Sequence, residues 1–329
     1  MNGNAADVAP DLAGHARFLI TTAARAPSVH NTQPWRFRVG PEAVELWCDP
    51  RRKLKTDAAG REMLISCGAA LFGLRLAIRS LGYLPVTELL PDRARLALLA
   101  RVSCGRPVPA GALERQMLEA VPHRHTHRDP FLPDPLPAGL LAGLQHDALA
   151  EGATLVFVNG GLSYQRLAGV VAAAARRGDL DPRARAEIRR WTRGPASKAR
   201  DGIPALAFAD RARRRAGVLP QRDFDLGRGL GQLRSGGECP LVTAVLLTTH
   251  DSRADWLRAG QALQRLLLHA ATRWVFASLH TQPLENAVTR GLIKDQLTLP
   301  GRPQMLLQLG RSATAPATAR RGPEEVAVP

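Results

Sequence analysis

The chain has few cysteines, no long hydrophobic run and very little lysine. The cysteines, Cys48, Cys67, Cys104 and Cys239, form no CxxC pair, which argues against a disulfide scaffold or a zinc site and favours reduced thiols in a cytoplasmic protein. No apolar stretch reaches the length of about 18 residues that a membrane span needs, and the longest candidate, residues 68–78, is interrupted by Arg75. The N-terminus has neither the basic nor the apolar region of a secretory signal, so we expect no membrane partner.

Because lysine is so rare, the positive charge is carried almost entirely by arginine. Lysine occurs four times among the 45 basic residues, which leaves 41 arginines, against 29 acidic residues and a net charge of +16. This charge fits either a nucleic-acid-binding surface or a compositional bias spread over a solvated surface. The arginine-rich segment 179–238 has only Trp191, Phe208 and Phe224 as aromatic residues and contains eight acidic ones. Nucleic-acid binding through stacked bases needs more exposed aromatics, so we expect no nucleic-acid partner.

Several motifs of cofactor binding and catalysis are also missing. No GxGxxG run opens a helix after a strand, and no Walker A, GxSxG or HExxH motif occurs. These absences argue against a classical dinucleotide fold, a P-loop, an α/β-hydrolase and a zinc protease. The length of 329 residues with 45% hydrophobic content still suffices for one large domain or two ordinary ones.

Hydrophobic periodicity and turn residues predict an α+β chain. We expect helices at 11–26, 58–82, 110–121, 137–150, 162–177 and 253–277, and strands at 35–39, 44–48, 86–90, 96–103, 154–158, 241–249 and 304–309. Segment 179–238 lacks a clear pattern and is expected to form short helices joined by mobile loops, as an insertion or lid.

Two of the expected helices share a pattern. Residues 68–76 and 260–268 both read G-x-A-L-x-x-L-x-L and lie 192 residues apart. The small residues allow close packing, and the leucines lie on one helical face. A pattern this short also arises by chance between leucine- and alanine-rich helices. With a strand-forming segment downstream of each, it indicates two related halves, as in a fused dimer.

The loop 26–37, APSVHNTQPWRF, is the most unusual local sequence. Two prolines stiffen it, and between them lie the hydrogen-bonding side chains of a candidate site. These are Ser28, His30, Asn31, Thr32 and Gln33. Amide groups both donate and accept, which suits the edge of a heteroaromatic ring. The alternative is a polar loop that caps helix ends.

Segment 123–128, HRHTHR, supports two hypotheses. Its three histidines at alternate positions would suit a metal, but the arginines between them repel a cation, so we expect no metal. Arg124, Thr126 and Arg128 suit a phosphate instead; a solvated basic loop is the alternative. In the C-terminal tail, Arg311, Arg320 and Arg321 either join a phosphate site or lie in a frayed terminus. The loop 278–285 contributes further candidates for ring contacts.

These segments together resemble a known family. The spacing P-S-x-x-N-x-Q-P-W at 27–35 is similar to the flavin-contacting signature of nitroreductase-fold proteins, and 124–131 is similar to their phosphate-binding opening. The two motifs occur in reversed order in a longer chain, which resembles the Acg subfamily of actinobacterial, dormancy-associated proteins with two fused nitroreductase-like halves.

The resemblance implies a fold, a cofactor and an activity. The expected fold has central mixed sheets flanked by long helices in an intramolecular pseudo-dimer, with halves at 1–121 and 122–329 and a lid at about 179–238. FMN would be bound by the residues named above, with Thr281 and Gln282 at the edge of the ring that carries N5. The activity would be NAD(P)H-dependent reduction of nitroaromatics or quinones by hydride transfer, with no protein acid, base or nucleophile required. The alternative is an FMN-sequestering protein whose lid prevents turnover. In either case the resemblance implies a monomer.

Overall fold

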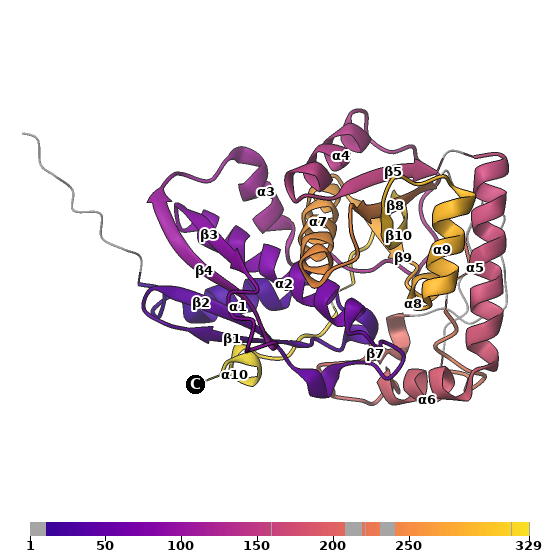
Figure 1. Ribbon diagram of the computed structural model, residues 1–329, viewed down its shortest axis with the longest axis horizontal. Coiled ribbons are helices and arrows are strands. Elements are labelled where there is room, and N and C mark those ends of the chain that lie inside the picture. The colour runs from indigo at the N-terminus through magenta and orange to yellow at the C-terminus, as the bar shows by residue number, and fades with distance from the viewer. Residues whose placement is uncertain are drawn as a thin grey trace, which may run out of the picture.

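The protein contains two four-stranded antiparallel sheets of the same topology (Figure 1). The computed structural model describes residues 11–158, 160–207, 219–220, 222–230, 241–316 and 318–328. The first sheet is formed by β1 (Trp35–Val39), β2 (Ala43–Cys48), β3 (Tyr83–Leu89) and β4 (Leu98–Pro107). The second is formed by β5 (Thr154–Val158), β8 (Val242–Thr248), β9 (Val275–Leu279) and β10 (Arg302–Arg311). Their orders are β1-β2-β4-β3 and β5-β8-β10-β9, so in chain order both sheets read first, second, fourth, third.

A long helix follows the second strand of each sheet. Helix α2 (Arg61–Ser80) connects β2 to β3, and α7 (Arg253–Ala271) connects β8 to β9. The two helices pack against each other between the sheets (Figure 1), and their inward residues are buried. Among the described residues, α2 is long and apolar enough to cross a membrane, and most of it is buried inside the protein.

Two glycines make this helix contact close. A methyl group on Gly68 would collide with the backbone carbonyl of Leu257, and one on Gly260 would collide with the carbonyl of Ile65. Both glycines occupy the first position of the shared G-x-A-L-x-x-L-x-L pattern. The close packing predicted from that pattern is therefore confirmed, and each copy of the motif contacts the helix that carries the other.

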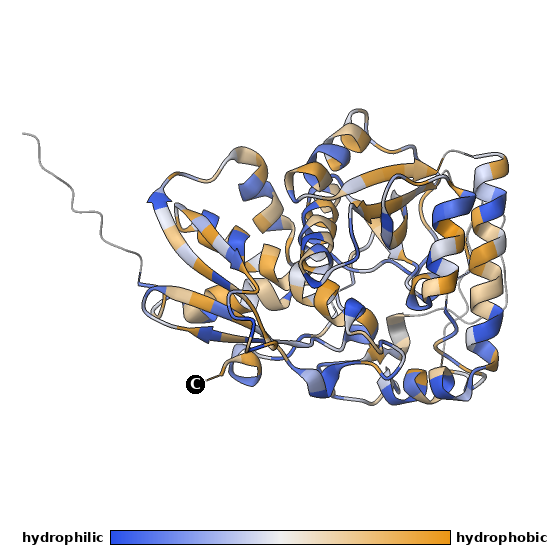
Figure 2. Cartoon of the chain, viewed as in Figure 1, coloured by the Kyte–Doolittle hydropathy of each residue, from blue (hydrophilic) through white to orange (hydrophobic). Residues whose placement is uncertain are grey.

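The remaining helices pack around the two sheets and the central helices. Helices α5 (Leu162–Leu180), α8 (Gln282–Glu285) and α9 (Ala287–Gln296) lie on one face of the second sheet, where Val171, Leu247 and Leu306 are in a common apolar cluster. Figure 2 shows a predominantly hydrophilic α6, in contrast to the apolar strands of the core. The others are α1 (Ala16–Ala24), α3 (Ala112–Ala120), α4 (Leu140–Ala150), α6 (Pro182–Trp191) and α10 (Pro323–Val326).

The expected α+β class is confirmed, with corrections of detail. Pairing within both four-stranded sheets is antiparallel where mixed sheets were expected, because hairpins and returning helices reverse the direction of neighbouring strands. The helix expected at 253–277 ends at Ala271, since the turn at Trp274 (φ 54°) leads into β9. In segment 179–238, α6 and the two-residue strands β6 (Thr192–Arg193) and β7 (Ile203–Pro204) are described. Residues 208–218, 221 and 231–238 of that segment lie outside the described residues, as does Cys239.

Candidate functional site

One pocket gathers side chains from segments far apart in the sequence. It is lined by the loop 27–30, the first turns of α2, segment 126–128, residues near 220–224 and the loop 278–284. Ile65, Leu263 and Met305 supply apolar walls. Six of the residues expected to bind flavin line it: Ser28, His30, Thr126, Arg128, Thr281 and Gln282.

The loop before β1 enters the pocket with a strained backbone. His30, Asn31 and Gln33 have φ of 52°, 54° and 49°, in the left-handed region that non-glycine residues rarely adopt. Such conformations cost free energy and tend to occur at functional sites. The Trp35 side chain, fully buried, fixes the end of the loop in the core of the first sheet.

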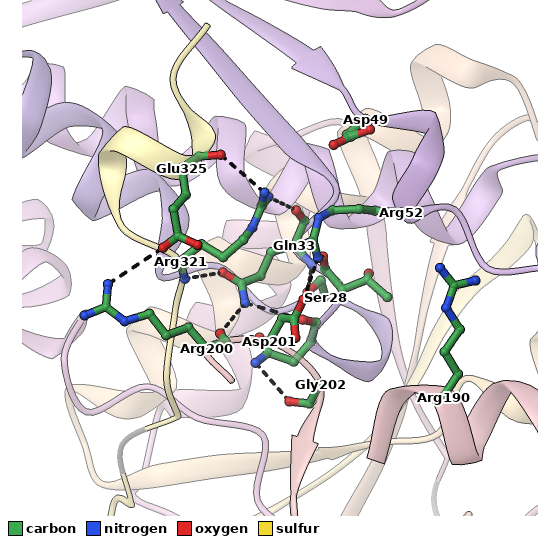
Figure 3. Close-up of polar contacts among 12 residues, drawn as sticks. Ser28, Gln33, Asp49, Arg52, Arg190, Arg200, Asp201, Gly202, Arg321 and Glu325 are labelled. Atoms are coloured by element: carbon green, nitrogen blue, oxygen red, sulfur yellow. Dashed lines mark hydrogen bonds and ion pairs between the residues drawn. The ribbon is translucent and has the colours of Figure 1, made fainter. Parts of the chain in front are cut away.

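Asn31 and Gln33 do not line the pocket. Their amides instead hydrogen-bond segments that are distant in the sequence, as Figure 3 shows for Gln33. Asn31 donates to the carbonyls of Gly202 (3.1 Å) and Ala319 (3.2 Å), and Gln33 donates to the carbonyl of Arg200 (2.8 Å). The Oδ1 of Asn31 has no hydrogen-bond partner in the described part of the chain.

The C-terminal tail returns to the first sheet, so the frayed-terminus alternative does not hold for residues 318–328. Val328 N donates to Phe37 O (2.8 Å), and Ala327 forms a parallel bridge with Phe37. Arg321 N donates to the side-chain oxygen of Gln33 (2.8 Å), and its guanidinium donates to the carbonyl of the same residue and to Trp35 O (3.3 Å) (Figure 3).

Three arginines gather beside the pocket. The guanidinium of Arg124 donates to Arg25 O (2.5 Å) and that of Arg320 to Ala26 O (3.1 Å), and Arg128 lies over the ring of Phe224. No ion pair joins Arg124, Arg128 or Arg320 to a carboxylate among the described residues. The buried Nε atoms of Arg124 and Arg320 have no hydrogen-bond partner there. Burial lowers the pKa of Arg320, and the charges of Arg124, Arg25 and Arg128 lower it further.

Besides Asn31 and Gln33, three more predicted residues lie apart from both the pocket lining and this cluster. Arg311 lies at the end of β10, where its backbone pairs with Leu132. Arg321 holds the tail, as described above. Thr32 is buried, and its carbonyl accepts a hydrogen bond from Arg52 (2.7 Å).

The histidines of segment 123–128 enter an aromatic cluster. His125 packs against Phe276, and His127 packs against Phe131 and hydrogen-bonds His125 (3.1 Å). Burial lowers the pKa of His125 to about 4. Among the described residues, no group of three His, Cys, Asp or Glu side chains converges as a metal site would require.

Sequence reasoning missed several pocket residues. Arg222 donates to Glu285 on α8 and lies 3.3 Å from His30 Nε2. Burial lowers the pKa of His30 well below its usual value, and the nearby Arg222 and Arg128 lower it further. Glu62 and His280 also line the pocket, and burial lowers the pKa of His280 to about 4. His280 lies in the candidate loop 278–285, but Glu62 and Arg222 belong to no local motif, so only the three-dimensional arrangement brings them to the pocket.

Sequence comparisons find relatives that align with nearly the whole chain. The protein named "Putative NAD(P)H nitroreductase Rv3131" of Mycobacterium tuberculosis is 34% identical over 313 residues, which cover 93% of this chain and 88% of the relative. "Putative NAD(P)H nitroreductase acg" of the same organism is 28% identical over 316 residues, 93% of each chain. A third relative, "Uncharacterized protein Rv3127", is 30% identical over 314 residues, 92% of this chain and 90% of the relative.

Family models and solved structures add less. No family model matches the chain. The FMN-dependent nitroreductase NfnB from Mycobacterium smegmatis, solved in complex with NADPH, aligns with 15% identity and a TM-score of 0.39, covering 65% of this chain and 97% of that protein. The family assignment therefore depends on the sequence relatives.

Proposed function

The chain belongs to the family of NAD(P)H nitroreductase-like proteins that includes Acg, and from this premise we propose that it binds FMN and uses NAD(P)H to reduce a nitroaromatic or quinone. The observation that carries the proposal is the cluster of Arg124, Arg128 and Arg320 beside the pocket. Like charges brought together without carboxylate partners favour an anion between them. The unpartnered Nε atoms of Arg124 and Arg320 are further donors for phosphate oxygens.

The pocket beside this cluster fits a planar ring. Its apolar walls would cover the ring faces, and a few polar groups would fix the ring's edge. Ser28, Thr126, Thr281 and Gln282 supply neutral donors and acceptors, and His30 is uncharged because it is buried beside two arginines. When bound, FMN supplies the hydride-transfer chemistry. The chain's own residues hold the phosphate, orient the ring and limit access of water.

Comparing FMN with riboflavin tests the phosphate assignment, because riboflavin lacks the phosphate. We expect Arg124→Ala and Arg128→Ala each to weaken FMN binding by about 1.5–3 kcal/mol and to leave riboflavin binding nearly unchanged, measured by quenching of flavin fluorescence. Arg311→Ala, outside the cluster, serves as the control and should bind both flavins like the wild type. Equal losses for FMN and riboflavin would count against the phosphate site.

Flavin sequestration is a second candidate function, because residues of the proposed insertion line the pocket and contact α8. Arg222 joins the insertion to Glu285 and approaches His30, and Phe224 lines the pocket from the same segment. An insertion held in this way would exclude a nicotinamide ring. Anaerobic mixing of the flavin-loaded protein with NADPH separates the two: bleaching of the visible flavin absorbance supports the reductase, and a persistent oxidised spectrum supports sequestration.

We also propose that residues 1–121 and 122–329 are the two halves of a fused dimer, with the insertion at about 179–238, and that the protein acts as a cytoplasmic monomer. The equal strand orders of the two sheets and the reciprocal contact of Gly68 and Gly260 support this division. Light scattering combined with flavin absorbance should give one FMN per single-chain particle. A dimer that binds flavin only when associated would contradict the proposal.

A further inference from the structure

Glu62 is a buried carboxyl group that the proposed function leaves unused. It is the second residue of α2 and lines the pocket, with 4% of the residue exposed. Neither side-chain oxygen has a hydrogen-bond partner in the described ranges. An ionised carboxylate in such surroundings would be costly, so a buried carboxyl is normally either paired or uncharged.

The two nearby cations direct their hydrogen bonds elsewhere. Arg61 donates to the side-chain oxygen of Gln304 (2.9 Å) and to backbone carbonyls of β10. Arg222 donates to Glu285. Burial, with the negative charges of Glu285 and Asp57, raises the pKa of Glu62 well above its usual value, against the opposing charges of Arg222 and Arg61. Burial without a hydrogen-bond partner thus favours the uncharged form of Glu62, whose O–H group is available to a ligand.

We propose that Glu62 is the pocket's hydrogen-bond donor to the carbonyl oxygen of an uncharged ring ligand. The inference rests on the proposed function, because that ring is either the isoalloxazine of the flavin or a quinone-type acceptor bound beside it. A neutral acid complements a carbonyl edge, whereas an ionised one would repel it. Glu62 would thus select uncharged, carbonyl-bearing ring ligands and weaken their binding as the pH rises.

The protonation of Glu62 can be tested without any ligand. At neutral pH, the infrared spectrum of the wild-type protein should contain the carbonyl stretch of a protonated carboxylic acid. Glu62→Gln should remove this band, and Glu119→Gln, which changes an exposed carboxylate on α3, should retain it. A spectrum unchanged by Glu62→Gln would overturn the proposal whether or not the protein binds flavin.

Ligand binding tests the donor role and identifies its acceptor. Riboflavin and menadione, an uncharged quinone, are titrated into wild type, Glu62→Gln and Glu62→Leu, with circular dichroism to confirm folding. We expect Glu62→Leu to weaken binding of the ligand that contacts Glu62 by about tenfold. Glu62→Gln, which keeps an N–H donor, should lose much less affinity. Because an amide does not ionise, binding to Glu62→Gln should not weaken at alkaline pH. The ligand whose affinity falls in Glu62→Leu, riboflavin or menadione, is the one whose carbonyl contacts Glu62.

The outcomes distinguish this proposal from the function on which it rests. Wild-type binding of both ligands with no loss in folded Glu62→Leu would overturn the role of Glu62 and leave the flavoprotein proposal standing. If the wild type binds neither riboflavin nor menadione, and FMN is also unbound, both proposals are overturned.

Discussion

His125 illustrates how burial of one ring makes stability depend on pH. Its pKa is lowered to about 4 by burial, against about 6.5 in an unfolded chain. Between these values the unfolded state binds a proton that the folded state does not, so the free energy of unfolding falls as the pH drops from about 6.5 to 4. The buried ring is thus a stabilising group only above this window.

Replacing this ring should flatten the acid side of the stability profile. In His125→Gln the contribution of up to about 1.4 kcal/mol per pH unit disappears between pH of about 6.5 and 4. Urea unfolding followed at several pH values would measure the slope for both proteins. Parallel profiles of variant and wild type would show that His125 titrates alike in the folded and unfolded chains.

At the scale of elements, the contact between α2 and α7 holds the two sheets together. Gly68 and Gly260 let backbone meet backbone, so the helix axes approach more closely than any side chain would permit. The close contact therefore requires glycine at both positions. At an uncrowded helix position, replacing glycine by alanine would instead stabilise the protein, because alanine is the better helix former.

Alanine substitutions should destabilise the protein at the two contact glycines and stabilise it at an uncrowded helix glycine. Gly68→Ala and Gly260→Ala are each expected to lower the free energy of unfolding by about 1–3 kcal/mol, because the helices must move apart. Gly169→Ala in α5, where an added methyl group meets nothing within 4 Å, should raise it by up to about 1 kcal/mol. The midpoints of urea unfolding check all three. Wild-type stability in Gly68→Ala would mean that the helices separate without cost.

At the scale of the whole molecule, the tail ties the end of the chain to its first sheet. Val326 is fully buried, and Arg321 completes the hydrogen bonds of the loop at Gln33. Arg320, the neighbouring residue, belongs to the arginine cluster. The tail therefore combines a structural role with a proposed binding role in adjacent residues.

Two variants should separate these roles. Deletion of residues 318–329 is expected to lower the melting temperature and to abolish the preference for FMN over riboflavin. Arg320→Ala, which keeps the rest of the tail, should lose that preference with little change in melting temperature. A deletion variant that melts like the wild type would contradict the structural role of the tail.

Much of this architecture could be predicted from the sequence, since strong periodicity marks the long helices and most strands. The glycine-led motif also predicted close packing of both long helices, but only the structure shows that α2 and α7 pack against each other. Local patterns fail where structure depends on distant partners: the helical pattern at 253–277 extends into β9, and no pattern predicts α8 or α9. Residues such as Glu62 and Arg222 carry no local signal, because their importance comes from burial and from neighbours on other segments.

The loop at 27–35 shows the same limit in another form. Its composition indicated a site, and Ser28 and His30 do line the pocket. Composition could not reveal that Asn31 and Gln33 direct their amides to the backbone at 200–202 and in the tail. A polar motif therefore locates a candidate site, but the role of each side chain follows only from its hydrogen-bond partners in the structure.

The return of the tail has a consequence for biosynthesis. Arg320 follows Arg128 by 192 residues along the chain, so it is made much later than Arg124 and Arg128. A nascent chain in which residues 318–328 are not yet made lacks one member of the arginine cluster and the tail segment that pairs with β1. Domains made first can fold early, but here the proposed anion site can form only after Arg320 has been made. A chain that stops before residue 318 would keep both four-stranded sheets and lack one arginine of the proposed site.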